Sequence, residues 1–407
     1  MTERLTYAAA LETILGQCEH GRRVVAVPIR EAAGLVLAEE IRSDIDMPAF
    51  DRAAMDGFAF RHADAAAGDE LRVAGTIAAG DAGVVRLGPG ECARIMTGAP
   101  VPADADTVIP VEETVSPTRE TVRLTSVPAR GSHIAPRGQD ARRECVVLTE
   151  GRMLRAPEIA ILASVGRRAA PVYAGPAIAF AATGEELVEP GEPLRPGAIR
   201  NANAYALWSQ IATARATPHY LGILPDRIEP LREGIAAGLE RDILVLSGGV
   251  SMGEFDLVPR VLEDLGVRIL FRRLQVRPGQ PTVFGVRERD GRRALVFGLP
   301  GNPISTLLAF DQYVAPAVRV SRGHPQPLAP VLQGELTGAV RKSPAFLMLS
   351  LCVARWSEGR VLLDPIRFHG SADIFATTGA DAVAYLPAGV SEVAAGTRVD
   401  FRMLFQG

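Results

Sequence analysis

The chain has 407 residues, of which 47% are hydrophobic and 22% charged, and its formal net charge is -3. This length is too great for one compact core and predicts two to four domains. The charge gives no basic character that would favour a nucleic-acid partner, and no apolar run approaches the ~20 residues that span a bilayer. The start of the chain lacks a signal-peptide core, and its four scattered cysteines form no Cys-x-x-Cys pair, so we expect a cytoplasmic protein.

The first elements predict a small helical lobe that is completed later in the chain. A helix capped by Thr6 comes first, and a second helix is expected from Pro28 to about Ile41. A third helix begins at Pro157 and is expected to rejoin the first two. We therefore predict a discontinuous lobe that comprises residues 1–44 and 151–175.

Residues 45–150 are predicted to form an inserted β-rich lobe. Short alternating strands are separated by turn pairs such as Gly68-Asp69 and Gly80-Asp81, a pattern typical of an all-β domain. Two of its segments, around Asp56 and around Thr97, contain more polar loop residues than strands require. These segments are candidates for function.

Residues 176–325 alternate between strand and helix patterns, which predicts a doubly wound parallel sheet. The apolar run Ile243–Leu246 is too short for a helix and is typical of a strand buried on both faces. It is followed by Ser247-Gly248-Gly249, and a helical period resumes after Asp256. In such a sheet, ligands are expected at the carboxyl ends of the strands. Residues 326–407 return to short strands and predict a small closing β-barrel-like domain.

Three loops of the α/β domain are expected to converge at one sheet edge: Thr183–Leu187, Ser247–Asp256 and Gly298–Pro303. Each offers backbone N–H groups, and two precede helices, which suits phosphate or another oxyanion. The same region carries carboxylates, which an anion alone would disfavour. A bridging Mg²⁺ would resolve this conflict. The carboxylates are Glu186, Asp242 and Asp256.

Each of these residues also has a simpler interpretation. Asp256 is equally well placed to cap a helix, and Glu186 to belong to a solvated acidic pair. Asp56 and Thr97 are common turn formers, and Asp140 can close a β-turn. Taken singly, none of these positions establishes a function.

The order of the motifs is more specific than any one of them. Seven occur in sequence: Met55-Asp56-Gly57-Phe58-Ala59, Met96-Thr97-Gly98-Ala99-Pro100-Val101-Pro102, Gly138-Gln139-Asp140, Thr183-Gly184-Glu185-Glu186-Leu187, Ser247-Gly248-Gly249-Val250-Ser251-Met252-Gly253, Pro278-Gly279-Gln280-Pro281 and Gly298-Leu299-Pro300-Gly301-Asn302-Pro303. In this order, and over nearly the whole chain, the sequence resembles the molybdopterin molybdenumtransferase family, which includes the C-terminal domain of gephyrin.

The resemblance implies a transferase of molybdenum cofactor biosynthesis. It implies insertion of molybdate into adenylylated molybdopterin, with Mg²⁺ as cofactor and AMP as product. It also implies a homodimer of four-lobed subunits in which the α/β domain of one subunit faces the β-lobe of the other. Expected partners are molybdopterin adenylyltransferase and the apoproteins of molybdoenzymes, with neither nucleic acid nor membrane.

The resemblance also carries over site residues. The catalytic candidates are Asp56, Thr97, Asp140, Glu186 and Asp242, and the candidate metal ligands among them are Asp56 and Glu186. The candidate substrate-binding residues are Ser247, Gly248, Gly249, Ser251, Asp256, Arg277, Gln280, Pro300, Gly301, Asn302 and Pro303.

The chain departs from the family at one charged motif. The family commonly has Lys-Pro-Gly-Lys-Pro where this sequence has Arg277-Pro278-Gly279-Gln280-Pro281, so one expected cation is absent, and Arg272 or Arg273 are candidates to compensate. The alternative is therefore a non-catalytic paralogue that binds or delivers molybdopterin or the finished cofactor. Adenylylation of molybdopterin is a third hypothesis, which the long β-rich lobes disfavour. The sequence does not separate molybdate from tungstate.

Overall fold

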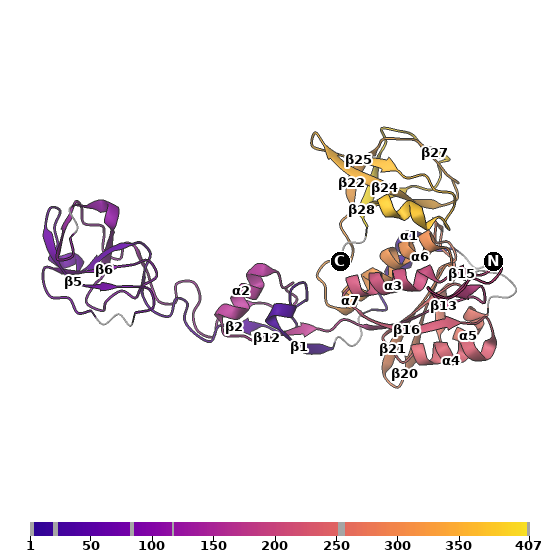
Figure 1. Ribbon diagram of the computed structural model, residues 1–407, viewed down its shortest axis with the longest axis horizontal. Coiled ribbons are helices and arrows are strands. Elements are labelled where there is room, and N and C mark those ends of the chain that lie inside the picture. Colours follow the sequence, from indigo (N-terminus) through magenta and orange to yellow (C-terminus); the bar gives the residue numbers. More distant parts are fainter. Residues whose placement is uncertain (1–3, 19–22, 82–84, 116–117, 251–256, 405–407) are drawn as a thin grey trace. The chain divides into compact units, whose positions relative to one another are not determined.

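The computed structural model describes residues 4–18, 23–81, 85–115, 118–250 and 257–404. The chain divides into two units (Figure 1). Unit 1 comprises Met1–Ala26 and Pro171–Gly407, and unit 2 comprises Val27–Ala170. The chain passes between the units within two strands that pair with each other, β1 (Val24–Pro28) and β12 (Ala169–Tyr173).

Unit 2 is built around a six-stranded sheet with the order β7-β4-β6-β5-β9-β8. The strands are β4 (Gly57–Phe60), β5 (Glu70–Ile77), β6 (Glu91–Ile95), β7 (Thr107–Pro110), β8 (Thr114–Val115) and β9 (Thr121–Leu124). Apolar residues on the two faces form separate clusters, one around Ile77, Ile95 and Val108 and the other around Phe58 and Phe60. The prediction of an inserted β-rich lobe is confirmed.

The remainder of unit 2 consists of short pairings and one helix. These elements are β2 (Ile41–Arg42), which pairs with β11 (Val146–Leu148), β3 (Arg52–Ala53), which pairs with β10 (Ile134–Ala135), and α2 (Ala156–Ser164). Short 3₁₀ turns lie at Ile29–Glu31, His62–Asp64 and Val111–Glu113.

The helix expected from Pro28 to about Ile41 is wrong. Only the 3₁₀ turn Ile29–Glu31 forms there. Gly34 has a φ of 77°, which ends any helical path. The backbone beyond it pairs with a distant segment instead, because Leu37 N–H donates to Arg152 O and Leu154 N–H donates to Leu35 O. Long-range pairing therefore overrides the local pattern.

The α/β domain of unit 1 has a six-stranded sheet with the order β16-β13-β17-β21-β20-β18. The first four strands are parallel, and the last two continue the sheet in antiparallel fashion. The strands are β13 (Ala177–Thr183), β16 (Thr217–Leu224), β17 (Ile243–Ser247), β18 (Arg268–Phe271), β20 (Val283–Arg289) and β21 (Arg292–Leu299). A small parallel pair, β14 (Leu187–Val188) and β15 (Ile199–Arg200), follows β13.

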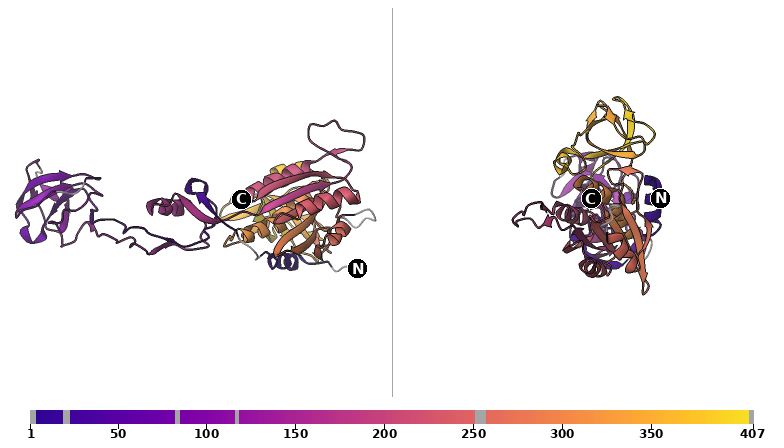
Figure 2. Two further views of the ribbon diagram at one scale, coloured as in Figure 1. Left: turned by 90° about the horizontal axis from the view of Figure 1, so that it is seen from below. Right: turned by 90° about the vertical axis from the view of Figure 1, so that its right-hand side faces the viewer.

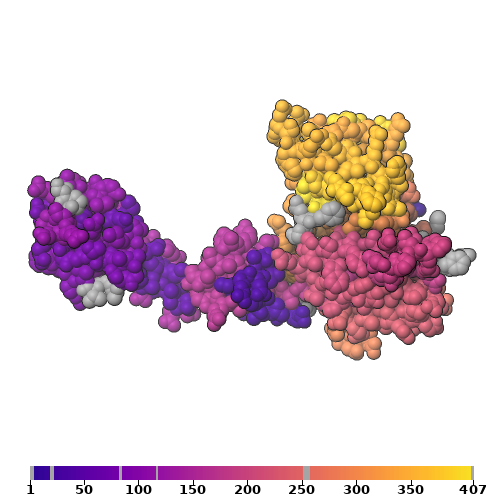
Figure 3. Space-filling model, viewed as in Figure 1, coloured from indigo at the N-terminus to yellow at the C-terminus, as the bar shows by residue number. Residues whose placement is uncertain are grey.

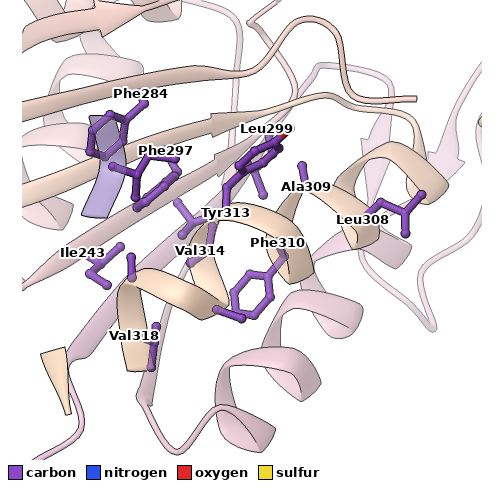
Figure 4. Packing of buried hydrophobic residues seen from close by; sticks show 14 of the residues in the cluster. Ile243, Phe284, Phe297, Leu299, Leu308, Ala309, Phe310, Tyr313, Val314 and Val318 are labelled. Atoms are coloured by element: carbon purple, nitrogen blue, oxygen red, sulfur yellow. The ribbon is translucent and has the colours of Figure 1, made fainter. Parts of the chain in front are cut away.

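Helices cover both faces of this sheet (Figures 1 and 2). Alternate residues of β17 face opposite layers: Ile243 and Val245 belong to one cluster and Leu244 and Leu246 to the other. Figure 4 shows residues of the first cluster, where Phe284 and Phe297 of the strands lie near the helix that carries Tyr313. The helices on that side are α1 (Tyr7–Leu15), α3 (Ala202–Thr213), α6 (Pro303–Ala309) and α7 (Ala315–Ser321), with the π-helical turn η4 (Phe310–Val314), whereas α4 (Ile228–Gly238) and α5 (Val258–Asp264) lie on the other side.

The last part of unit 1 is a small closed barrel. Its strands follow the order β24-β25-β22-β28-β26, and β26 pairs again with β24. These strands are β22 (Leu332–Leu336), β24 (Leu347–Ser357), β25 (Arg360–Pro365), β26 (Ala382–Leu386) and β28 (Arg398–Met403). The barrel lies against the α/β domain (Figure 3), to which β19 (Val276–Arg277) links it by pairing with β24. Smaller elements are β23 (Val340–Arg341), β27 (Glu392–Val393) and the 3₁₀ turn Ile374–Gly379.

The predicted fold class, a doubly wound α/β domain with an inserted β-rich lobe and a C-terminal barrel, is confirmed. Within the discontinuous N-terminal lobe, however, the expected packing of the first helix is corrected, because α1 packs in the α/β core of unit 1 whereas α2 belongs to unit 2. Among the described residues, no helix is both long and apolar enough to cross a bilayer.

Candidate functional site

The first part of the site lies at the carboxyl edge of the parallel sheet. β13 ends at Thr183, β17 at Ser247 and β21 at Leu299, and these ends are adjacent because Ala182 pairs with Ser247, and Ser247 with Leu299. The chain leaves β13 for β16 on one side and returns to β17 on the other. Such a reversal opens a crevice at the strand ends where ligands bind.

Two glycines after Ser247 bring the backbone close to Thr183. Gly248 and Gly249 both have positive φ, 97° and 63°. A Cβ atom on Gly248 would lie 2.6 Å from Thr183 O, and one on Gly249 would lie 2.7 Å from Thr183 Oγ1. Any side chain would therefore displace the loop. The Thr183 hydroxyl is buried and has no hydrogen-bond partner among the described residues, so a donor or acceptor for a ligand remains at this edge.

The Gly298–Pro303 loop is held against this edge by one asparagine. Asn203, at the start of α3, donates from Nδ2 to Ser247 Oγ at 2.9 Å and to Gly301 O at 2.7 Å. Gly301 faces Gly248, because a Cβ added to Gly301 would lie 3.6 Å from the Cα atom of Gly248. The loop is fixed from behind by Thr306 Oγ1, which donates to Pro300 O at 2.5 Å. The two glycine-bearing loops thus form one cradle, which we call the strand-end cradle: Ser247–Gly249 and Pro300–Asn302.

A cavity of about 490 Å³ adjoins the cradle, because Pro300 and Asn302 line it as well. The barrel contributes the facing wall, including Phe346 and Ser371. Asn302 Nδ2 donates to Ser371 Oγ at 2.7 Å and so connects the two walls. The complete lining is Arg277, Pro278, Gly279, Gln280, Pro281, Pro300, Asn302, Ser305, Arg341, Lys342, Ser343, Phe346, Met348, Phe368, Gly370 and Ser371. We call it the oxyanion cavity, since its described lining contains three cationic side chains and no carboxylate.

The three cations differ in how they are engaged. The Lys342 ammonium donates to Ser343 O, Phe346 O and Val390 O at 3.0–3.2 Å, and burial lowers its pKa. Arg341 pairs with Glu392 at 2.9 Å. The guanidinium of Arg277 instead stacks on the ring of Phe346, with its Cζ atom 4.2 Å from the ring centroid. This side chain forms no hydrogen bond or ion pair with the described residues, although the backbone of Arg277 pairs with β24 as part of β19. Its guanidinium edges are available to a ligand.

Gln280 lies on the same wall as Arg277 and is half-buried. Its carbonyl accepts from the N–H groups of Leu274 and Thr282, which fixes the turn that carries its side chain. The neutral side chain at position 280, where the resemblance implies a lysine, therefore belongs to a residue that lines this cavity.

The two predicted carboxylates that the structure describes in unit 1, Glu186 and Asp242, lie apart from each other. Glu186 follows β13 and is exposed. Asp242 precedes β17, so it lies at the opposite, amino-terminal end of the strand from Ser247. There it accepts from Ala177 N–H at 2.7 Å and lines a different cavity. The expectation that Asp242 joins the strand-end loops is therefore corrected. Ser251 and Asp256 lie outside the described residues.

Of the three candidates in unit 2, Asp56 and Thr97 are in direct contact, whereas Asp140 pairs with Arg52. Asp56 Oδ1 accepts from both the N–H and the hydroxyl of Thr97 at 2.6 Å. These two hydrogen bonds hold the pKa of the exposed Asp56 carboxyl below its ordinary value. Asp140 is also exposed and lies 3.7 Å from Arg52 Nη2. Asp56 is therefore ionised at neutral pH.

Replacing Thr97 by valine is expected to raise the pKa of Asp56 toward the ordinary aspartate value, because the hydroxyl donor is lost. A lowered pKa stabilises the fold above the unfolded-state pKa, and that stabilisation is lost as pH falls through the folded-state pKa. As the pH falls, the Thr97→Val variant should therefore lose the stabilisation from the ionised Asp56 at a higher pH than the parent. Carboxyl-carbon NMR titration measures the pKa; Thr97→Ser should keep the parent value, and an unchanged Thr97→Val value would contradict the assignment.

The donor set for Mg²⁺ is sparse. Within the described ranges, no three His, Cys, Asp or Glu side chains cluster closely enough to hold a metal ion. Mg²⁺ commonly takes only one or two protein carboxylates together with substrate phosphates. Glu186 alone, exposed beside the strand ends, fits such a minimal role. Asp56 belongs to the other unit, so its pairing with Glu186 at one ion stays a prediction.

Several site residues were not predicted from the sequence. They are Asn203, Ser305, Arg341, Lys342, Phe346 and Ser371. Asn203 stands two positions after the helix cap Asn201. A second asparagine at the start of a helix was the local signal that could have marked Asn203 as a site residue. The barrel residues lie more than 60 positions from Arg277 or Gln280 in sequence, and nothing local marks them.

Comparison with known proteins gives matches along most of the chain. Three family sequence models match: the MoeA N-terminal region (domain I and II) at residues 5–166, a probable molybdopterin binding domain at 179–320, and the MoeA C-terminal region (domain IV) at 333–404.

Individual relatives agree with these matches. The molybdopterin molybdenumtransferase of Bacillus subtilis (strain 168) is 32% identical over 387 residues, which cover 93% of this chain and 89% of the relative. The Haemophilus influenzae protein of the same name is 34% identical, over 79% of each chain. The crystal structure of the molybdopterin biosynthesis MoeA protein from Pyrococcus horikosii is similar with a TM-score of 0.83 and 30% identity, over 100% of both chains.

Proposed function

The chain belongs to the molybdopterin molybdenumtransferase family, and on that premise we propose that it inserts molybdate into adenylylated molybdopterin and releases AMP. It is thus a transferase of molybdenum cofactor biosynthesis. We further propose that it works in the cytoplasm as a homodimer, with Mg²⁺, and exchanges substrate and product with molybdopterin adenylyltransferase and molybdoenzyme apoproteins.

One observation supports this reaction most directly: the strand-end cradle and the oxyanion cavity share Pro300 and Asn302. The reaction needs a phosphate-bearing pterin and a tetrahedral oxyanion side by side. The cradle suits the first, because its glycine loops close at the strand ends on the Thr183 hydroxyl, which has no partner among the described residues, although the Gly248 N–H itself is taken by Leu299 O. The cavity suits the second, because its described lining combines cations with neutral donors.

In this assignment, the residues of the cavity bind and orient molybdate. Arg277 offers two N–H groups from a plane fixed by Phe346, and the Ser305 and Ser371 hydroxyls and the Gln280 amide line the same space. Neutral donors and the guanidinium of Arg277, which has no hydrogen-bond or ion-pair partner among the described residues, would hold the oxyanion beside the dithiolene. They would not neutralise the negative charge of the oxyanion fully.

The role of Asp56 follows from its protonation state. Because Thr97 lowers its pKa, the carboxylate is ionised at neutral pH and is a poor proton donor. We assign it to orienting a cation or a water molecule rather than to supplying protons for the departing oxo groups. Glu186 would hold Mg²⁺ against the substrate phosphates, whose charge the ion would neutralise.

The test is incubation of the purified chain with adenylylated molybdopterin, Mg²⁺ and molybdate. AMP release that depends on molybdate supports the proposal. Tight pterin binding without AMP release would support the alternative, a binding or delivery paralogue, which Gln280 in place of a lysine favours. Consumption of ATP with unadenylylated molybdopterin would support adenylylation. Tungstate in a parallel incubation compares the two oxyanions.

Replacing Gln280 by lysine is expected to lower the Kd for molybdate about threefold to tenfold at low ionic strength, because an ammonium would enter the oxyanion cavity. The gain should shrink in high salt, where the charge is screened. Calorimetric titration of molybdate measures it, with Gln280→Met as the neutral control of similar length. Equal affinities at low salt for the lysine variant and the parent would remove Gln280 from the oxyanion site.

A further inference from the structure

We propose that Arg4 supplies a second cation to the oxyanion cavity from its position at the ring of Phe346, which Arg277 also contacts. The inference rests on the proposed function of that cavity as the molybdate site. It deepens the assignment by naming the residue that offsets the neutral Gln280.

Backbone pairing fixes the position of Arg4. Leu5 forms a parallel bridge with Leu274, and its N–H donates to Arg273 O at 3.1 Å. In return, Gln275 N–H donates to Leu5 O at 2.7 Å. The segment that carries Arg4 therefore runs beside the residues that lead into β19, at whose end Arg277 stands. Arg4 does not itself line the cavity, but the hydrogen bonds of Leu5 hold its segment beside residues 273–275, just before Arg277 of the cavity wall.

The ring of Phe346 brings the two arginines together. Phe346 is 5% exposed, lines the oxyanion cavity and lies within reach of both guanidinium groups. The Cζ atom of Arg277 is 4.2 Å from the ring centroid, and that of Arg4 is 5.3 Å away. The ring attracts both cations through its quadrupole, but the cations repel each other. An anion in the adjoining cavity relieves this repulsion.

Three of the other candidate cations are occupied, and the fourth, Arg273, neither lines the cavity nor stacks on Phe346 within the described residues. Lys342 and Arg341 are held by carbonyl oxygens and by Glu392, as described above. Arg272, a candidate to compensate for Gln280, instead pairs with Glu263 at 2.5 Å. Within the described part of the chain, the guanidinium of Arg4 forms no hydrogen bond or ion pair, and its recorded contact is with the Phe346 ring. Together, Arg4 and Arg277 restore the two positive charges that the family motif carries on its two lysines.

The test measures molybdate binding by calorimetric titration of the full chain at two ionic strengths. Arg4→Ala should raise the Kd about threefold to tenfold at about 10 mM salt, where the Debye length is about 30 Å. The difference should disappear near 1 M salt, where that length is about 3 Å. Arg4→Lys keeps the charge and should retain most of the affinity. Arg268→Ala, which removes an exposed arginine of β18, should bind like the parent.

Three outcomes would overturn the inference. Molybdate affinity that is unchanged in Arg4→Ala at low salt would remove Arg4 from the site. An equal loss in Arg4→Ala and Arg4→Lys, or a loss that persists in high salt, would indicate packing rather than charge. A weaker affinity for AMP with unchanged molybdate binding would move Arg4 to the nucleotide phosphate.

The kinetic readout separates this inference from the proposed function. In AMP release, Arg4→Ala should raise the molybdate concentration for half-maximal rate while leaving kcat within about twofold. If the parent releases no AMP, the proposed reaction fails, but the titrations still decide whether Arg4 attracts oxyanions. If the parent is active and the variant matches it in both assays, only the assignment of Arg4 fails.

Discussion

Replacing Arg277 by alanine is expected to raise the molybdate concentration for half-maximal AMP release about tenfold to a hundredfold. Among the described lining of the oxyanion cavity, Arg277 is the cation whose guanidinium is not already engaged by a hydrogen bond or an ion pair. A hydrogen bond to a charged group contributes about 1.5–3 kcal/mol, and about 1.4 kcal/mol corresponds to a tenfold change in affinity.

Two further variants make this measurement specific. Arg277→Lys keeps the charge but loses the planar fork and its stacking on Phe346, so it should recover only part of the affinity. Arg268→Ala removes an exposed arginine that does not line the cavity and should match the parent. A stable, folded Arg277→Ala variant with the molybdate dependence of the parent would show that the oxyanion binds elsewhere.

Replacing Gly57 by alanine is expected to destabilise unit 2 by about 3 kcal/mol or more and to abolish turnover. A Cβ atom at this position would lie 1.9 Å from Ile109 O and 3.0 Å from Pro110 Cα. Both contacts are backbone atoms of β7, which pairs with β4 along its whole length and cannot retreat without breaking the sheet. Because Asp56 directly precedes Gly57, the pair formed by Asp56 and Thr97 would be displaced as well.

Thermal unfolding followed by calorimetry should show this loss in the transition of unit 2. The matched control is Gly88→Ala in the same unit, where the nearest atoms to an added Cβ are those of the Glu91 carboxyl, at 3.6 Å. That contact is ordinary and ends on a flexible side chain, so the control should unfold like the parent. A Gly57→Ala chain with the unfolding profile and activity of the parent would contradict the observed β4–β7 register.

The sequence predicted those parts of the fold that depend on local periodicity. The continuous apolar run Ile243–Leu246 does form a strand buried on both faces, and Asn302 does precede a helix at Pro303. The helix predicted after Pro28 fails for the opposite reason: its backbone is paired with residues more than a hundred positions away, around Arg152. Periodicity carries no information about such pairing.

The site was predictable only on one of its two walls. The glycines at 248 and 249 and the turn that carries Arg277 were found because small residues and charges stood out in short motifs. Phe346 and Ser371 looked like ordinary barrel residues, and their role arises only when the barrel closes over the α/β domain. Likewise, the sequence does not reveal that position 57 requires glycine, because the atom that excludes a side chain, Ile109 O, comes from another strand, β7.

Asp242 shows how an acidic residue beside a motif can mislead. It stands five positions before Ser247, which is close in sequence, but an extended strand separates the two by its full length. Residues on either side of a strand therefore serve opposite edges of the sheet. Its hydrogen bond to Ala177 N–H explains the carboxylate as a tie between neighbouring strands.

The pairing of β1 with β12 has a consequence for the way this polypeptide is assembled. Residues 27–170 leave and re-enter unit 1 through adjacent, hydrogen-bonded strands, so they form a domain inserted into unit 1 at one place. The entropic cost of closing a loop grows only with the logarithm of its length. A long insertion therefore destabilises unit 1 far less than its length alone would suggest. Unit 1 can therefore retain its own core while residues 27–170 are lengthened, shortened or exchanged.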